Sequence, residues 1–218
     1  MSSSVVELPN VTGTCPEFLS AAVRRAVRSG GSWQETADRV AAALRGRLPG
    51  PGLLSPRQLV GDPSGYQTHL IHAEPDGSFS ILVMVWLPGQ TTPVHDHLSW
   101  CVTAVLQGTE YEEVYRVVPG GPQRFPGALR TPKGAPGASR TPLTGYSRAS
   151  SPRHRGDRLE VVARNANPVG TVSGFAPPGD IHRVTNVGDS VAVSMHVYGT
   201  DITRVGSSVR RVYDLPVR

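Results

Sequence analysis

The stretch Gly89-Gln-Thr-Thr-Pro-Val-His95-Asp-His97-Leu-Ser-Trp-Cys101 places two histidines one residue apart. Side chains alternate across an extended chain, so the imidazoles of His95 and His97 are expected on one face. Imidazole is a good ligand for iron, zinc, copper and nickel. Two imidazoles on one face make half of a metal site, and a third ligand must come from elsewhere in the chain.

A second segment, Pro177-Pro-Gly-Asp-Ile-His182-Arg-Val-Thr-Asn186, offers that ligand. His182 follows a Pro/Gly turn and begins an apolar run, which is typical of the start of a strand. The predicted metal ligands are therefore His95, His97 and His182. Three histidines alone would also fit zinc or another metal. Asp96 is expected to point away from the site, as a solvated or structural carboxylate.

Together the two segments resemble the two sequence motifs of cupin proteins. Gly170 lies one residue too early for the leading glycine of the second motif, and the glutamate position of the first motif holds Cys101. The resemblance implies an all-β cupin fold, a double-stranded β-helix or jelly-roll barrel, with two N-terminal α-helices. The positions that match the motif spacing are Gly89, His95, His97, Gly108, Pro177, Gly179, His182 and Asn186.

The departure at Cys101, with the run Ser194-Met-His196-Val-Tyr198, is similar to the cysteine dioxygenase family of cupin-type thiol dioxygenases. The similarity extends from about residue 66 to about residue 199. It implies that the three histidines hold Fe²⁺ and that Ser194, His196 and Tyr198 form a catalytic row beside the metal. It also implies that Cys101 can be linked to Tyr198 through a thioether, as in some members. A buried, inert cysteine is the alternative for Cys101.

The implied activity is the oxidation by O₂ of a small carboxylated thiol, L-cysteine or 3-mercaptopropionate, to the sulfinate. Family members place an arginine two residues after a tyrosine on the first barrel strand, where this chain has Tyr66 and Thr68. Threonine cannot make a bidentate contact with a carboxylate. The 3-mercaptopropionate dioxygenase branch supplies an arginine from after the triad strand, which makes Arg204 the first candidate and Arg183 the second. Tyr66 and Trp100 are expected to line the substrate pocket.

Two other functions stay open at this point. The missing arginine at Thr68 is compatible with a metal-dependent cupin oxidoreductase that acts on a different substrate in a biosynthetic pathway. A non-catalytic cupin sensor would use a basic insertion at about residues 120–156 as its output arm.

The length of 218 residues suits one domain with a substantial core. Residues 1–62 are expected to form an N-terminal arm and helices that pack on the barrel, and residues 63–218 the cupin domain. Helical spacing runs from Cys15 to about Arg28, and from Ser32, with Glu35 at the capping-box position, to about Leu48. Some eight strands with turn residues between them favour a sandwich or barrel.

The net charge of +5 is concentrated in one segment, because residues 121–158 hold eight basic residues and one acidic residue. The remainder holds 14 basic and 16 acidic residues. We therefore expect no nucleic-acid partner. The insertion is rich in Pro and Gly and is expected to be disordered.

No apolar stretch is long enough to span a membrane, so no membrane partner is expected. The start of the chain lacks the pattern of a signal peptide. Two cysteines give no disulfide framework, which predicts a cytoplasmic location. The expected partners are a small-molecule thiol and O₂, and the expected assembly is a monomer or a small homo-oligomer.

Overall fold

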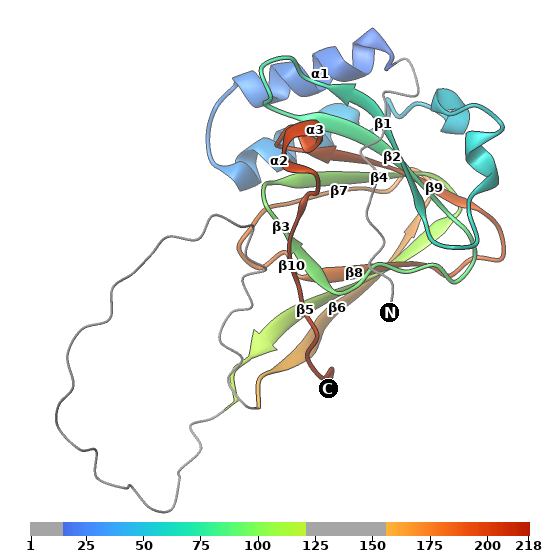
Figure 1. Cartoon of the computed structure of the whole chain (residues 1–218). Helices are drawn as coiled ribbons and strands as arrows, with labels where there is room; N and C mark the ends of the chain where they lie inside the picture. The colour runs from blue at the N-terminus through green and yellow to red at the C-terminus, as the bar shows by residue number, and fades with distance from the viewer. Residues whose placement is uncertain (1–14, 121–155) are drawn as a thin grey trace, which may run out of the picture.

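The computed structural model describes residues 15–120 and 156–218, and most of the predicted arm and insertion lies outside these ranges. Two five-stranded sheets face each other, with antiparallel pairing in each sheet (Figure 1). The first sheet has the order β1-β2-β9-β4-β7, with bounds Gln67–Ala73, Ser80–Trp86, Ala192–Tyr198, Cys101–Gln107 and Val172–Phe175. The second has the order β10-β3-β8-β5-β6, with bounds Val209–Val212, His95–His97, His182–Asn186, Thr109–Val118 and Arg158–Pro168. The predicted all-β architecture, a sandwich or barrel of antiparallel strands, is confirmed.

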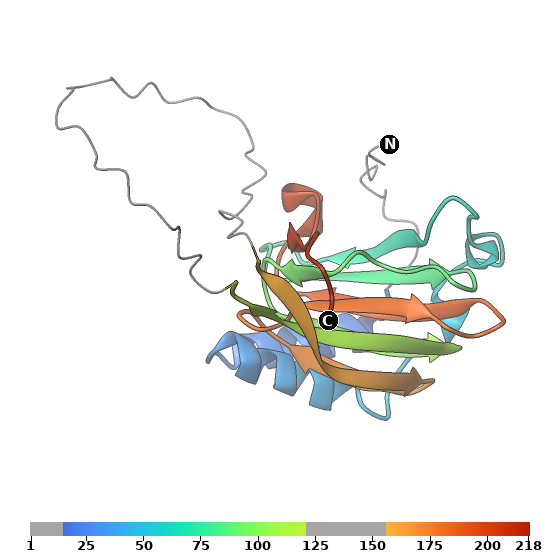
Figure 2. The same cartoon turned by 90° about the horizontal axis from the view of Figure 1, so that it is seen from below.

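Two helices, α1 (Glu17–Arg28) and α2 (Trp33–Leu44), cover the outer face of the first sheet (Figures 1 and 2). The predicted capping box of α2 is present, since the Ser32 hydroxyl accepts from the Glu35 backbone and the Glu35 carboxylate accepts from the Ser32 backbone. The helix ends at Leu44, four residues before the predicted end. It lies so close to β7 that a Cβ atom on Gly174 would come 2.9 Å from the Ala37 carbonyl oxygen.

The central strand β9 is buried on both faces. On the outer face Val193, Met195 and Val197 join the core cluster that α1 and α2 close. Each such side chain, when fully buried, contributes roughly 1.5–3 kcal/mol. The intervening residues point into the space between the two sheets. This arrangement fixes one face of β9 by helix packing and leaves the other to line the barrel interior.

In the second sheet, the short strand β3 pairs with β8 and with β10. Between the two histidines of β3, Asp96 points away from them and accepts hydrogen bonds from the side chains of Arg210, Arg211 and Tyr213. Asp96 is thus structural, as predicted, but it is buried and not solvated. The position of β3 therefore depends on residues more than one hundred positions away.

Several short elements were not predicted from the sequence. They are β10, the helix α3 (Ile202–Val205) and two 3₁₀ turns (Pro51–Leu53 and Gln58–Val60). Each is too short to show a hydrophobic period. Within the described residues, none of the helices is both long enough and apolar enough to cross a bilayer.

Candidate metal centre

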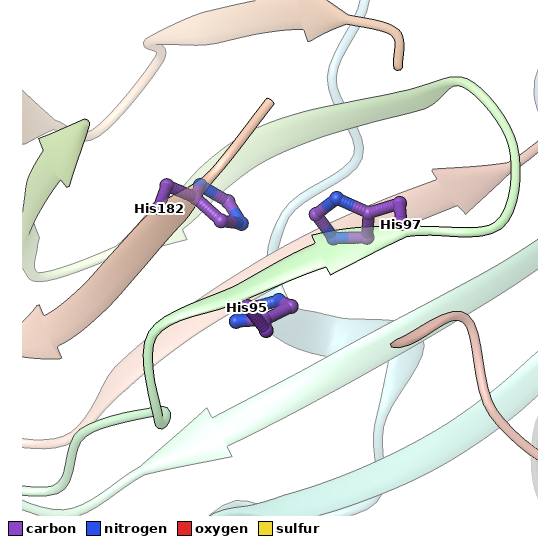
Figure 3. Close-up of side chains that lie close together, drawn as sticks. All are labelled: His95, His97 and His182. Atoms are coloured by element: carbon purple, nitrogen blue, oxygen red, sulfur yellow. The ribbon is translucent and has the colours of Figure 1, made fainter. Parts of the chain in front are cut away.

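His95, His97 and His182 converge in the barrel interior (Figure 3). The first two come from β3, and the third is the residue directly opposite His95 at the start of β8. One ring nitrogen from each residue lies within 4.8 Å of the others, and all three residues are buried. Such a set could hold one metal ion, with each residue giving one ligand atom.

The two histidines of β3 have their Nδ1 atoms occupied by acceptors outside the cluster. His95 Nδ1 lies 3.0 Å from the Pro93 carbonyl oxygen, and His97 Nδ1 lies 3.0 Å from Asp180 Oδ2. Asp180 also accepts from the backbone N–H of His97, also at 3.0 Å. An Nδ1 beside an acceptor carries the ring proton, which leaves Nε2 bare for a metal.

The third histidine follows the same rule. His182 Nδ1 lies 2.7 Å from Glu112 Oε1, and the other oxygen of Glu112 accepts from the side-chain amide of Asn165 at 3.0 Å. All three imidazoles are therefore held in the tautomer that presents Nε2, two by carboxylates and one by a carbonyl. Outer partners of this type orient metal-ligating histidines and raise their basicity.

The pKa values of a ligand histidine and of a carboxyl partner favour the binding of a metal ion. Burial, and then the neighbouring rings of His182 and His97, lower the pKa of His95 to about 3, so its imidazole is neutral at neutral pH. Burial would raise the pKa of the Asp180 carboxyl, but hydrogen bonds from the His97 ring and backbone outweigh it and hold that pKa below its usual value. A neutral imidazole beside an ionised carboxylate is the state that binds a cation.

The predicted row on β9 lies beside this cluster. Ser194 Oγ is 3.0 Å from His196 Nε2, and the Tyr198 hydroxyl is 3.2 Å from His196 Nδ1. The Tyr198 ring centroid is 5.9 Å from that of His97. The indole N–H of Trp86 donates to Ser194 Oγ at 3.0 Å. The three residues form a hydrogen-bonded row that ends next to the three histidines, and all three are buried.

Cys101 on β4 is the direct cross-strand partner of Tyr198 on β9. Directly opposite residues of an antiparallel pair have Cβ atoms about 4.5–5.5 Å apart. Both side chains are buried and share a small cluster with Leu70, Leu82 and Ile202. Burial raises the pKa of the Cys101 thiol well above its usual value. The cysteine is thus adjacent to the phenol and protonated in this state.

Thr68 on β1 belongs to the same inner face, because the ladder places it opposite Met84, which in turn lies opposite Ser194. Tyr66, just before β1, has its ring 4.4 Å from that of Trp86. Burial raises the pKa of Tyr66. The structure therefore brings Thr68 and Tyr66 to the serine end of the row.

Three other predicted contacts lie outside the barrel. Trp100 belongs to the core cluster under the helices, since it alternates with the inward Cys101, and its indole covers Gly199. Arg204 is largely exposed and pairs with Asp201 at 3.0 Å. In this structure neither Trp100 nor Arg204 lines the barrel interior.

The second arginine candidate also points outward. Arg183 alternates with the inward His182 on β8 and pairs with Glu113. In the described ranges, no arginine or lysine is buried. The buried acids, by contrast, include Glu110 and Glu112 on β5 and Asp180. The interior charge of the barrel is therefore acidic in this part of the chain.

The sequence analysis missed Glu112, Asp180 and Glu110. A signal existed for two of them, because Glu110 and Glu112 stand at i and i+2 in a strand and so share one face. Asp180 stands two residues before His182, within the second motif. Its contact with His97 spans 83 residues of sequence, and no local pattern reports such a contact.

No family model matches the chain. Among solved structures, it is similar to a cupin superfamily protein from Desulfitobacterium hafniense DCB-2, with 8% identity over 69% of this chain and 86% of that one and a TM-score of 0.38. A cupin 2 conserved barrel domain protein from Salinispora arenicola CNS-205 gives 16% identity, 69% and 87% coverage and a TM-score of 0.37. A recombinant oxalate oxidase in complex with glycolate gives 16% identity, 71% and 62% coverage and a TM-score of 0.38.

Proposed function

We propose that this protein is an Fe²⁺-dependent thiol dioxygenase, which uses O₂ to oxidise the thiol of a small molecule to a sulfinate. The observation that carries the proposal is the row Ser194, His196 and Tyr198, which ends beside three histidines that each present Nε2. Three neutral imidazoles leave a bound cation with its full charge and with open coordination positions.

When bound, ferrous iron would supply coordination positions for a thiolate and dioxygen and the electrons that start the reaction. Both oxygen atoms end on the sulfur and the thiol hydrogen ends on the sulfinate group, so the reaction balances without a further reductant. The donor set fits iron in this role, because the two carboxylates act behind the imidazoles and leave the inner positions free.

In this proposal the residues of the chain bind and orient the molecule at the metal centre. The Tyr198 hydroxyl is proposed to hydrogen-bond that molecule, and its contact with His196 Nδ1 supports that role. Burial lowers the pKa of His196 to about 3, so this ring stays neutral and acts by its tautomer. The buried pair of Cys101 and Tyr198 supports a thioether between them, which O₂ would form by removing two hydrogen atoms.

The substrate is proposed to be a small thiol, with L-cysteine and 3-mercaptopropionate as the first two to test. Because Arg204 and Arg183 lie outside the barrel, the hydroxyls of Thr68 and Tyr66 are the proposed contacts for a carboxylate. We further propose a cytoplasmic protein that acts on a small molecule as a monomer or small homo-oligomer.

The test is O₂ consumption by the Fe²⁺-loaded protein against L-cysteine, 3-mercaptopropionate, cysteamine and a peptide with an N-terminal cysteine, with the product identified by mass. Uptake of one O₂ for each sulfinate formed from one of these thiols supports the proposal. Protein that holds one iron and consumes no O₂ with any thiol contradicts it.

A metal-dependent oxidoreductase with a different substrate is the second candidate. The observation that favours it is the lack of buried arginine or lysine in the described residues, which removes the usual partner of a carboxylate. The same assay separates the two, because this candidate predicts no sulfinate from the thiol panel in iron-loaded protein.

A further inference from the structure

Phe175, the last residue of β7, contacts two of the ligand histidines but has no role in the proposed function. Its ring centroid lies 5.0 Å from that of His182 and 5.3 Å from that of His97. Both distances are within the range of direct contact between aromatic rings. The phenyl ring therefore lies against two of the three residues that could hold a metal ion.

The ladders of the first sheet place Phe175 in a row with two residues already described. Phe175 on β7 is the direct partner of Cys101 on β4, and Cys101 is the direct partner of Tyr198 on β9. Directly paired residues of a sheet share one face. The Tyr198 ring is also a neighbour of His97, so both ends of the row carry an aromatic ring beside this histidine. The row therefore spans the side of the metal centre that faces the first sheet.

The three ligand histidines, by contrast, all come from the second sheet, on β3 and β8. A metal ion that is held from one side has its remaining coordination positions on the opposite side. A molecule that binds there has to fit against the row on the first sheet. Except for the Tyr198 hydroxyl, the surroundings of the row are apolar, since its members share a cluster with Leu70, Leu82 and Ile202.

Phe175 is the member of the row that stands nearest to the edge of the sheet. It is partly exposed, whereas Cys101 and Tyr198 are buried, and β7 is the last strand in the order of the first sheet. The backbone just before it is fixed, because a Cβ atom on Gly174 would come 2.9 Å from the Ala37 carbonyl oxygen of α2. In such close packing β7 cannot shift outward to make room for a larger molecule.

We propose that Phe175 is a specificity-determining residue, whose ring limits the size of the molecule that binds at the metal centre beside His97 and His182. A short, unbranched ligand keeps clear of the ring, whereas a bulky group next to the metal-binding atom meets it. Because α2 holds the backbone of β7, space for that group would have to come from displaced side chains, which is unfavourable. The selection of a small thiol rests on the proposed function, but the size limit itself does not.

The test compares imidazole with 4-phenylimidazole, two neutral metal ligands that differ by one phenyl group. Each is titrated into full-length protein loaded with Co²⁺, and the visible spectrum of the metal gives the two dissociation constants. Relative to their affinities for free Co²⁺, the native protein should favour imidazole by about tenfold or more. In Phe175→Ala this preference should fall about tenfold, because the ring that meets the phenyl group is absent.

The ratio of the two affinities separates a size limit from a packing role. If Phe175 only supported the rings of His97 and His182, its removal would disturb the metal site for both ligands alike, and the ratio would not change. Phe175→Leu keeps an apolar side chain and should shift the ratio in the same direction by a smaller factor. It also keeps the test decisive if the alanine variant does not fold.

Phe18→Ala is the matched control, since Phe18 lies on α1 and is 54% exposed. It should keep the native ratio. A native protein that binds the two ligands equally well, or binds neither, overturns the proposal, and so does a native ratio in the folded Phe175 variants. These titrations need neither O₂ nor a thiol, so their failure and that of the dioxygenase assay are distinguishable.

Discussion

The two faces of strand β9 share one backbone but differ in what their side chains contact. Val193, Met195 and Val197 pack against helix side chains in a closed apolar core. Ser194 and Tyr198, on the other face, hydrogen-bond to His196, and the Tyr198 ring lies next to that of His97. Since side chains alternate, stability and chemistry are assigned to neighbouring residues. Substitutions on the two faces should therefore separate folding from function, and the following experiments test that separation.

The largest expected effect is the loss of the metal centre. His182→Ala removes one of three ligands, so it should abolish stoichiometric iron binding and all activity of the iron-loaded protein. Metal content by elemental analysis measures it. His72→Ala is the control, because His72 pairs with Glu74 outside the barrel and should leave iron at the native level. Retention of one iron per chain in His182→Ala would contradict the ligand assignment.

On the other face, Met195→Ala should lower the free energy of unfolding by about 2–5 kcal/mol, because it leaves a cavity under the helices. Denaturant unfolding of the metal-free protein measures this. Met195→Leu keeps the volume and should cost less than about 1.5 kcal/mol. The folded fraction of Met195→Ala should still bind one metal ion. A variant that loses the metal before it loses stability would break the separation of the two faces.

Removal of a hydrogen-bond partner of a ligand histidine is expected to have a smaller effect on metal binding than removal of the ligand itself. Glu112→Ala removes the acceptor of His182 Nδ1 and should weaken metal affinity about 10- to 100-fold, measured by competition with a chelator. Glu113→Ala is a matched control one residue away, since Glu113 points outward and pairs with Arg183. Equal affinities in the two variants would show that the carboxylate behind His182 does not orient it.

The smallest expected effect is that of Tyr198→Phe. It removes one hydroxyl and should leave iron stoichiometry unchanged while turnover falls about tenfold, which corresponds to about 1.4 kcal/mol in the barrier. Tyr111→Phe on the outer side of β5 is the control for loss of a phenol. The variant also cannot form the thioether, so the mass difference of two hydrogen atoms should vanish from its Cys101 peptide.

The same alternation explains how far the sequence could be interpreted. Alternation and turn residues are local signals, and they predict strands over Gln67–Ala73 and His182–Asn186, which are the limits of β1 and β8. The three histidines were found because each lies in a short local motif. Trp100 was misplaced although the signal was available, since an inward Cys101 requires its neighbour to point outward.

Other features have no local signal. The contacts of Glu112 with His182 and of Asp180 with His97 join segments 70 and 83 residues apart, and they form only when the two sheets meet. Arg204 illustrates the reverse case, because a residue at a suitable sequence position lies on the surface and pairs with Asp201. Strand β10 is short and rich in arginine, so neither period nor hydrophobicity marks it.

The pairing of β3 has a consequence for the order of synthesis. Strand β3 carries two of the three histidines, but it is three residues long and its neighbours are β8 and β10. Both of these strands are synthesised after β3. Asp96 accepts hydrogen bonds from Arg210 within β10 and from Tyr213, which follows it. On the ribosome His95 and His97 have no partner strand until these segments emerge. Metal binding by all three histidines therefore has to follow the emergence of β8 and β10.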